Sequence, residues 1–209
     1  TDKDIIVFCG VRFMAETAKL HAPDKTVLLQ EIEAGCSLAD SITPEDVRAL
    51  RHQHPGVPVV CYVNTSAAVK SECDACCTSS NAQLGVESFG APEVILVPDE
   101  YLAAYVAANT RVRIIPWRGH CEVHERSTGE EVREYRKSTQ AYVLAHPECP
   151  QDVQDAADYV GSTSGMIATI AREQPKLAVL ITECSMADNI AGAFPDTDFQ
   201  RPCNLCPHM

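Results

Sequence analysis

Basic residues are scarce in this chain: 17 lysines and arginines stand against 29 aspartates and glutamates, which leaves a net charge of −12. A surface for nucleic acid or for an anionic membrane needs a basic patch, so the charge balance argues against both. No apolar run approaches the ~20 residues of a membrane span, and the first residues lack a signal-peptide pattern. We therefore expect a soluble, cytoplasmic protein with no nucleic-acid or membrane partner.

Cysteine, in contrast, is abundant. The chain has 11 cysteines, an odd number, so they cannot all pair with one another. Cys9 and Cys61 lie in apolar, strand-like runs, where a free cysteine behaves as a small hydrophobic residue. This usage indicates an intracellular protein with reduced thiols, some of which bind a metal.

Short apolar runs alternate with amphipathic stretches along the chain, a pattern typical of parallel sheets covered by helices. Thr43 and Pro44 are a strong helix start, with an N-cap and a proline at the first helical position. The pattern predicts strands at 5–9, 26–29, 57–63, 76–78, 94–97, 112–116, 142–145, 159–160 and 177–181. It predicts helices at 13–20, 44–54, 67–72, 81–89, 99–108, 129–137, 151–157, 164–173 and 186–193.

The chain also contains an internal repeat. Cys36, Cys121 and Cys206 are spaced 85 residues apart (121 − 36 and 206 − 121). Tyr62 follows the first of these cysteines by 26 residues and His146 follows the second by 25, each at the end of a predicted strand. Matching offsets of this kind indicate two copies of a unit of about 85 residues, preceded by the end of a third.

Polar clusters follow most of the predicted strands, and ligands bind at the carboxyl ends of the strands in open parallel sheets. If three units face one another, the three cysteines form a ring of thiolates. Such a ring suits a four-iron cluster that leaves one iron open to act as a Lewis acid. Catalytic zinc with three protein ligands stays an alternative. Cys203 and Cys206 could equally be a redox pair.

Other polar residues are candidates for substrate binding and proton transfer. The hydroxyl runs 78–81 and 162–165 precede helices, so they could bind a phosphate or a carboxylate, or simply cap the helices. His146 and Glu148 suit acid–base chemistry, unless they are an exposed loop pair. His120 and His124 could support Cys121, although for His124 we expect a surface position. Tyr62 and Asn64 could face the same cavity.

Taken together, these motifs resemble those of the quinolinate synthases, a family of [4Fe-4S] enzymes of NAD biosynthesis. The resemblance rests on stretches that span the chain: 8–19, 34–38, 62–67, 78–81, 98–99, 117–121, 146–148, 161–164 and 206–209. It implies an α/β fold of three similar parallel-sheet domains around a pseudo-threefold axis, the first of them incomplete. The corresponding segments are 1–34, 35–118 and 119–200, with 201–209 carrying the last cysteine.

The resemblance also implies an activity and a site. The reaction is the condensation of iminoaspartate with dihydroxyacetone phosphate to quinolinate, with loss of phosphate and water. The cluster ligands carry over to Cys36, Cys121 and Cys206, which leave one iron open. The catalytic residues carry over to Glu148, His146 and Tyr62, and the substrate-binding residues to Asn64, Ser79, Ser162 and Thr163. A functional link to an L-aspartate oxidase or dehydrogenase is expected.

Two other functions compete with this interpretation: a non-catalytic iron–sulfur or redox-sensing module, and a zinc-dependent α/β enzyme. The chain lacks the N-terminal part that is usual in the family and ends three residues after Cys206, before the usual helical tail. We expect the 209 residues alone to hold a cluster poorly and to turn over little.

Overall fold

The structure is a computed structural model that describes residues 1–200 and 205–208, which fall into two compact units. Unit 1 comprises Thr1–Gly119 and Pro207–Met209, and unit 2 comprises His120–Cys206. The described strands form three sheets in which all pairings are parallel. Helices connect the strands, as parallel pairing requires.

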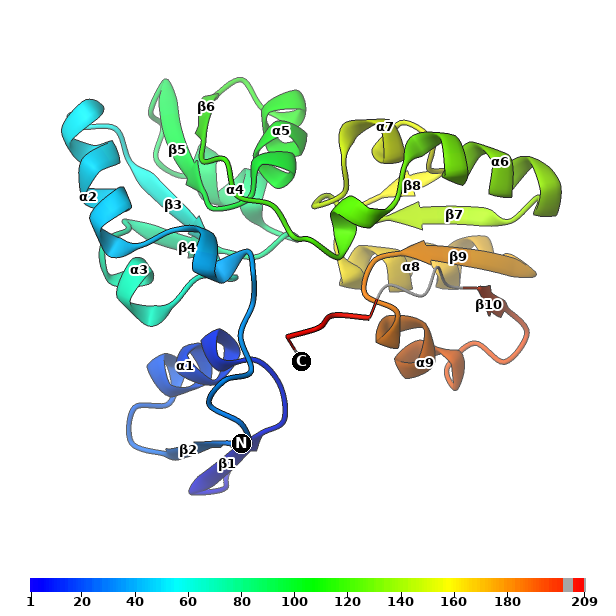
Figure 1. Cartoon of the computed structure of the whole chain (residues 1–209), viewed down its shortest axis with the longest axis horizontal. Coiled ribbons are helices and arrows are strands. Elements are labelled where there is room, and N and C mark those ends of the chain that lie inside the picture. Colours follow the sequence, from blue (N-terminus) through cyan, green and yellow to red (C-terminus); the bar gives the residue numbers. More distant parts are fainter. Residues whose placement is uncertain (201–204, 209) are drawn as a thin grey trace. The chain divides into compact units, whose positions relative to one another are not determined.

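The four-stranded sheet of unit 1 has the strand order β4-β3-β5-β6 (Figure 1). Helices pack on both of its faces. Val59 and Cys61 pack with Val69 of α3 on one face, whereas Gly85 of α4 lies against Val60 on the other. The elements are α2 (Pro44–Gln53), β3 (Val59–Tyr62), α3 (Ala67–Ser71), β4 (Ala75–Cys77), α4 (Ala82–Glu87), β5 (Glu93–Val97), α5 (Glu100–Asn109) and β6 (Arg113–Pro116).

The four-stranded sheet of unit 2 has the same topology, β8-β7-β9-β10. Val143 and Val179 pack on the side of α6 and α7, while Leu144 and Leu180 pack on the side of α8 and α9. The elements are α6 (Gly129–Thr139), β7 (Tyr142–Ala145), α7 (Gln151–Gln154), β8 (Tyr159–Val160), α8 (Thr163–Glu173), β9 (Leu177–Ile181), α9 (Ser185–Ala191) and β10 (Asp198–Gln200).

The repeat extends to individual hydrogen bonds. Thr43 and Thr128, 85 positions apart, each form a capping box at the start of α2 and α6. Asp74 accepts a bond of 2.8 Å from a backbone N–H of β3, and Asp158 accepts one of 2.9 Å from β7. Each carboxylate also pairs with an arginine of the helix before that strand, Arg51 of α2 and Arg136 of α6. The internal repeat predicted from the cysteine spacing is therefore confirmed.

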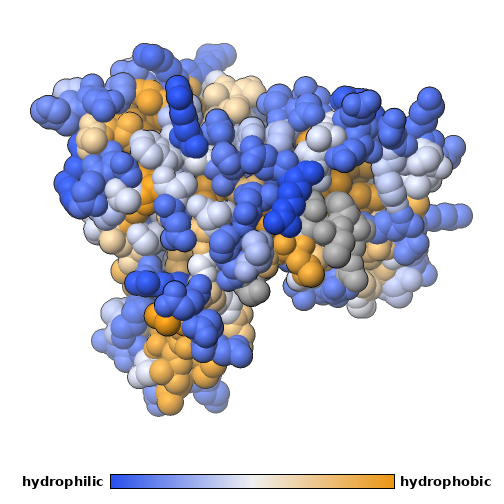
Figure 2. Space-filling view, viewed as in Figure 1, coloured by the Kyte–Doolittle hydropathy of each residue, from blue (hydrophilic) through white to orange (hydrophobic). Residues whose placement is uncertain are grey.

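Near the N-terminus, a two-stranded sheet and its connecting helix correspond to the second half of this repeat, and the described residues include no first half for it. The elements are β1 (Ile5–Phe8), α1 (Arg12–His21) and β2 (Thr26–Leu29), which follow one another as β5, α5 and β6 do. Ile5, Val7 and Leu28 are 57%, 63% and 49% exposed. Hydrophobic surface accordingly gathers over these strands (Figure 2).

The predicted α/β class with three parallel sheets is confirmed, whereas the pseudo-threefold arrangement and the domain bounds stay predictions. The expected helix 151–157 is wrong at its end, because Ala156 and Ala157 close turns with i→i−3 bonds instead of continuing α7. β10 was not predicted, since Phe199 is the only apolar residue of this edge strand. No helix within the described ranges is long and apolar enough to span a bilayer.

Candidate functional site

The strand order of unit 2 reverses between β7 and β9, and polar residues stand at the carboxyl ends of both strands. His146 directly follows β7, and Thr182 directly follows β9. The backbone N–H of His146 donates to the carbonyl oxygen of Ile181 at 3.1 Å, which keeps the two strand ends together. Open parallel sheets bind ligands outside such a reversal point.

The loop after β7 turns Glu148 into the protein. The backbone N–H of Cys149 donates to the carbonyl of His146 at 2.9 Å. The amide of Gln154 in α7 donates to the carbonyls of Pro147 and Cys149 at 3.0 and 2.8 Å. As a result Glu148 is only 1% exposed and His146 only 4%. The alternative of a solvent-exposed loop pair is therefore wrong.

Four side chains form a buried polar chain at this point. Thr182 Oγ1 lies 3.0 Å from His124 Nε2, and His124 Nδ1 lies 3.6 Å from Glu148 Oε2. Glu148 Oε1 in turn lies 3.4 Å from His146 Nδ1. The two imidazole rings stack with their centroids 5.0 Å apart. A carboxylate is thus held between two imidazoles in a place that excludes water.

The surface position expected for His124 is wrong, since this residue is only 8% exposed. It lies in the 3₁₀ helix η2 (His124–Arg126), which repeats η1 (Ala39–Ser41) of unit 1 after 85 positions. Ala39, at the equivalent position, is also buried, at 7% exposure. The charged residues Glu122, Glu125 and Arg126 around His124 give no sign of this burial in the sequence, whereas the apolar residue at the equivalent position, Ala39, could have predicted it.

Burial also determines the charge of the two histidines. It lowers the pKa of His146 to about 4, an effect that the nearby Glu148 carboxylate opposes only in part. It lowers the pKa of His124 as well, again against the attraction of Glu148. Both imidazoles are therefore neutral near pH 7, so each offers one nitrogen as a donor and one as an acceptor.

Cys121 lies beside this group. One ligand atom each from Cys121, His124 and Glu148 fall within 4.8 Å of one another. Cys121 precedes a turn that leads into η2, and the backbone N–H of Glu125 donates to its carbonyl at 3.1 Å. A thiol, an imidazole and a carboxylate thus converge within unit 2.

Cys36 occupies the equivalent position in unit 1. It precedes a turn into η1, and the backbone N–H of Asp40 donates to its carbonyl at 2.9 Å. Its half-buried side chain packs against Val11, Phe13 and Ala39. Two of the three predicted thiol ligands therefore have the same local backbone structure, each in its own unit.

Cys206 is also half-buried and follows Leu205, whose carbonyl oxygen accepts a bond of 3.2 Å from Arg126 of η2. The segment that carries Cys206 is thereby tied to the turn after Cys121, within unit 2. Cys203, the other member of the suggested redox pair, lies outside the described residues.

The predicted substrate-binding residues of unit 1 also lie at strand ends. Tyr62 is the last residue of β3 and is 6% exposed, and Asn64 is half-buried two residues later. Lys70 holds this turn by donating to the carbonyl of Val63 at 2.8 Å. Ser79 is half-buried in the loop between β4 and α4. These residues belong to unit 1 and the His146–Glu148 pair to unit 2.

Ser162 and Thr163 begin α8 in unit 2. Ser162 Oγ accepts a bond of 3.2 Å from the backbone N–H of Gly165, so this hydroxyl caps the helix. Thr163 is exposed at the first helical position. Gly161 and Gly165 must lack side chains, because a Cβ at either would come within 2.3 and 2.2 Å of the Tyr159 hydroxyl oxygen.

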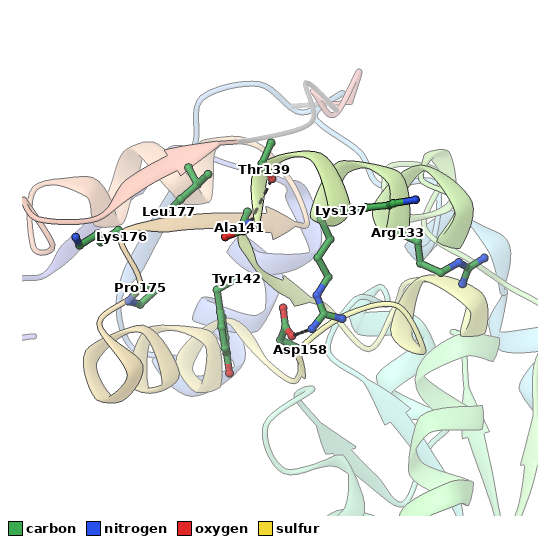
Figure 3. Close-up of a pocket in the computed structure, with 11 residues that line it drawn as sticks. Arg133, Lys137, Thr139, Ala141, Tyr142, Asp158, Pro175, Lys176 and Leu177 are labelled. Atoms are coloured by element: carbon green, nitrogen blue, oxygen red, sulfur yellow. Dashed lines mark hydrogen bonds and ion pairs between the residues drawn. The ribbon is translucent and has the colours of Figure 1, made fainter.

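A cavity of about 830 Å³ opens at the other end of the unit 2 sheet, where β7 and β9 begin (Figure 3). Arg133, Arg136 and Lys137 of α6 and Lys176 before β9 line it. Asp158 pairs with Arg136 in its wall. The predicted site residues that the structure describes do not line this cavity.

Comparison with known proteins identifies the family. The family model described as "Quinolinate synthetase A protein" matches residues 1–209. A quinolinate synthase of Agrobacterium fabrum is 61% identical over 209 residues, which are all of this chain and 61% of that protein. Quinolinate synthase 2 of Mesorhizobium japonicum is 60% identical, with 100% and 65% covered, and a quinolinate synthase of Xylella fastidiosa is 59% identical, with 100% and 62% covered.

The chain thus spans less than two thirds of the length of these three curated relatives, and all of it aligns with them. Both the family model and the relatives cover the segments that carry the resemblance. The chain belongs to the quinolinate synthetase A family.

Proposed function

We propose that this chain supplies part of a quinolinate synthase, which condenses iminoaspartate with dihydroxyacetone phosphate to quinolinate with loss of phosphate and water. The observation that carries the proposal is an identity of 61% to a quinolinate synthase over all 209 residues. The substrates are small anionic molecules, and the reaction belongs to NAD biosynthesis. A functional link to an L-aspartate oxidase or dehydrogenase, and a cytoplasmic location, are parts of the same proposal.

The donor atoms of the chain suit an iron–sulfur cofactor. Cys36, Cys121 and Cys206 are thiols, each half-buried in a loop. Thiolate sulfur is the usual ligand of such clusters. We assign these three residues as ligands of a [4Fe-4S] cluster. When bound, the cluster supplies a Lewis-acidic iron that carries no cysteine.

Glu148 and His146 are assigned to proton transfer. Glu148 Oε1 lies 3.4 Å from His146 Nδ1, and both side chains are nearly inaccessible to water. A neutral imidazole beside a carboxylate can pass a proton in either direction without creating a second buried charge. Glu148 accepts the proton that a substrate carbon or nitrogen releases, and His146 stabilises the carboxyl group that results.

Hydroxyl and amide groups are assigned to substrate binding. Ser162 Oγ accepts a hydrogen bond from the backbone, so its own hydrogen stays available to donate to a carboxylate or a phosphate. Thr163 is exposed beside it at the N-terminus of α8, where the helix dipole favours an anion. Ser79 has the same role in unit 1, and Tyr62 and Asn64 orient the substrate by hydrogen bonds.

The test uses Glu148→Gln in a protein of the relatives' length that carries this sequence. We expect the reconstituted variant to bind as much iron and sulfide as the parent and to be equally brown, while quinolinate formation stops. Glu125→Gln, on the exposed side of η2, is the matched control and should keep its activity. Turnover by Glu148→Gln at the parental rate would remove Glu148 from the mechanism. A colourless, zinc-loaded protein would contradict the cluster assignment.

A further inference from the structure

Cys121, His124 and Glu148 combine three of the side-chain types that bind transition metals best. Their ligand atoms lie within 4.8 Å of one another in unit 2. Zinc binds thiolate, imidazole and carboxylate ligands at ~2.0–2.3 Å, so the ligands around one ion lie roughly 3.3–3.8 Å apart. Closing the three side chains onto one ion needs shifts of about 1 Å, which side-chain rotations supply.

The orientation of His124 is a second, independent observation that indicates a metal site. Its Nε2 lies 3.0 Å from Thr182 Oγ1, which can accept a hydrogen bond from it. Its Nδ1 faces Glu148 Oε2 at 3.6 Å and makes no hydrogen bond within the described part of the chain, although the ring is only 8% exposed. With the proton on Nε2, the lone pair of Nδ1 points at a carboxylate oxygen. A cation between these two atoms relieves that unfavourable contact.

Thr182 completes the arrangement found around metal-binding histidines. Such a histidine usually donates its second ring N–H to an oxygen atom, which fixes the tautomer and the orientation of the ring. Thr182 stands at the end of β9 and is 7% exposed, so its hydroxyl is held by the sheet. The imidazole is therefore oriented before any ion arrives.

We propose that Cys121 Sγ, His124 Nδ1 and the Glu148 carboxylate form a binding site for a single divalent ion of the zinc type. The Cys121 thiol releases its proton to solvent as the sulfur–metal bond forms. Three protein ligands with an open fourth position are the usual set of a zinc site that exchanges ligands. Co²⁺ takes the same ligand types and serves as a coloured probe.

The site has a consequence for cofactor loading. Cys121 is also an assigned cluster ligand, so the single ion and the cluster compete for the same sulfur atom. Occupation by zinc therefore blocks cluster assembly and also engages the carboxylate assigned to proton transfer. This consequence rests on the proposed function, whereas binding of the single ion does not.

The experiment titrates the iron-free, reduced chain with Co²⁺ under anaerobic conditions and then displaces Co²⁺ with Zn²⁺. We expect one equivalent to bind with the intense near-ultraviolet absorption of a thiolate–cobalt bond. His124→Gln and Glu148→Gln should each weaken binding about ten-fold or more, and Thr182→Val should do so by about ten-fold. His120→Ala is the matched control, since His120 lies next to Cys121 but pairs with Glu125 on the surface.

Two further variants separate this site from the cluster ligands. Cys36→Ser and Cys206→Ser should bind Co²⁺ as the parent does, because neither residue belongs to the trio. Loss of binding in Cys36→Ser with normal binding in His124→Gln would overturn the proposal. So would a chain that assembles its cluster but takes up no Co²⁺. Co²⁺ binding by a chain that fails to assemble a cluster would support this site and count against the proposed function.

Discussion

The burial of His146 makes the stability of this protein depend on pH in a calculable way. The pKa of His146 is about 4 in the folded protein because of burial, against an ordinary value of ~6.5. Below pH ~6.5 His146 binds a proton in the unfolded chain but stays neutral in the folded chain until the pH approaches 4. The stabilisation is thus complete above that pH and is lost as the pH falls towards 4. His146 alone should lower the free energy of unfolding by about 2 kcal/mol at pH 5 and about 3 kcal/mol at pH 4.

The assay is urea unfolding of the metal-free chain at pH 7, 6, 5 and 4, for the parent and for His146→Gln. Other groups titrate in both proteins, so the difference between the two free energies of unfolding isolates His146. That difference should shrink by about 3 kcal/mol from pH 7 to pH 4. His52→Gln, at an exposed position of α2, is the matched control and should follow the parent. A difference that stays constant across this range would refute the burial of a neutral His146.

Three further predictions concern packing and thiol chemistry. Gly119→Ala should lower the melting temperature by several degrees, because the new Cβ would lie 2.3 Å from Ser41 Oγ and 2.5 Å from the Pro98 carbonyl oxygen. Gly192→Ala is the control and should leave the melting temperature unchanged, because its Cβ would meet nothing within 4 Å. Equal melting temperatures for the two variants would contradict the close approach at Gly119. Asp158→Ala should lower the free energy of unfolding by about 1–3 kcal/mol, because it removes the acceptor of the Val143 N–H and the partner of Arg136; an unchanged urea midpoint would count against this role. At pH 8, mass spectrometry should find iodoacetamide on exposed Cys9 long before it finds the label on Cys61 and Cys77. A hydrogen bond with Cys73 raises the pKa of Cys61 to about 12, and burial raises the pKa of Cys77 to about 12. Labelling of all three thiols at the same rate would contradict those shifts.

The sequence predicted the repeated α/β topology well, because its signals are local. The strands Thr26–Leu29, Tyr142–Ala145 and Leu177–Ile181 coincide with short apolar runs, and the structure bounds them at the predicted residues. Thr43 predicted the start of α2 by its capping chemistry. The strand at Asp198–Gln200 has no such run, and it forms because β9 offers an open edge.

The candidate site was predicted in part. His146 and Glu148 were expected at a strand end, where the structure has them, but their burial was not expected. That burial depends on His124 and Thr182, which are distant in sequence and meet the pair only in the folded unit. Most residues around His124 are charged, namely Glu122, Glu125 and Arg126, so its local pattern indicates a surface. Tertiary packing buries His124 in spite of that pattern. The sequence signal for this burial is the repeat, which has the buried residue Ala39 at the equivalent position.

We propose above that Cys36, Cys121 and Cys206 hold a four-iron cluster that leaves one iron without a cysteine. The most direct measurement is a crystal structure of the anaerobically reconstituted protein, with anomalous diffraction recorded at the iron absorption edge. We expect one compact group of four iron atoms, with these three sulfur atoms each bonded to a different iron. Iron bound by other cysteines, or a fourth cysteine on the remaining iron, would contradict it.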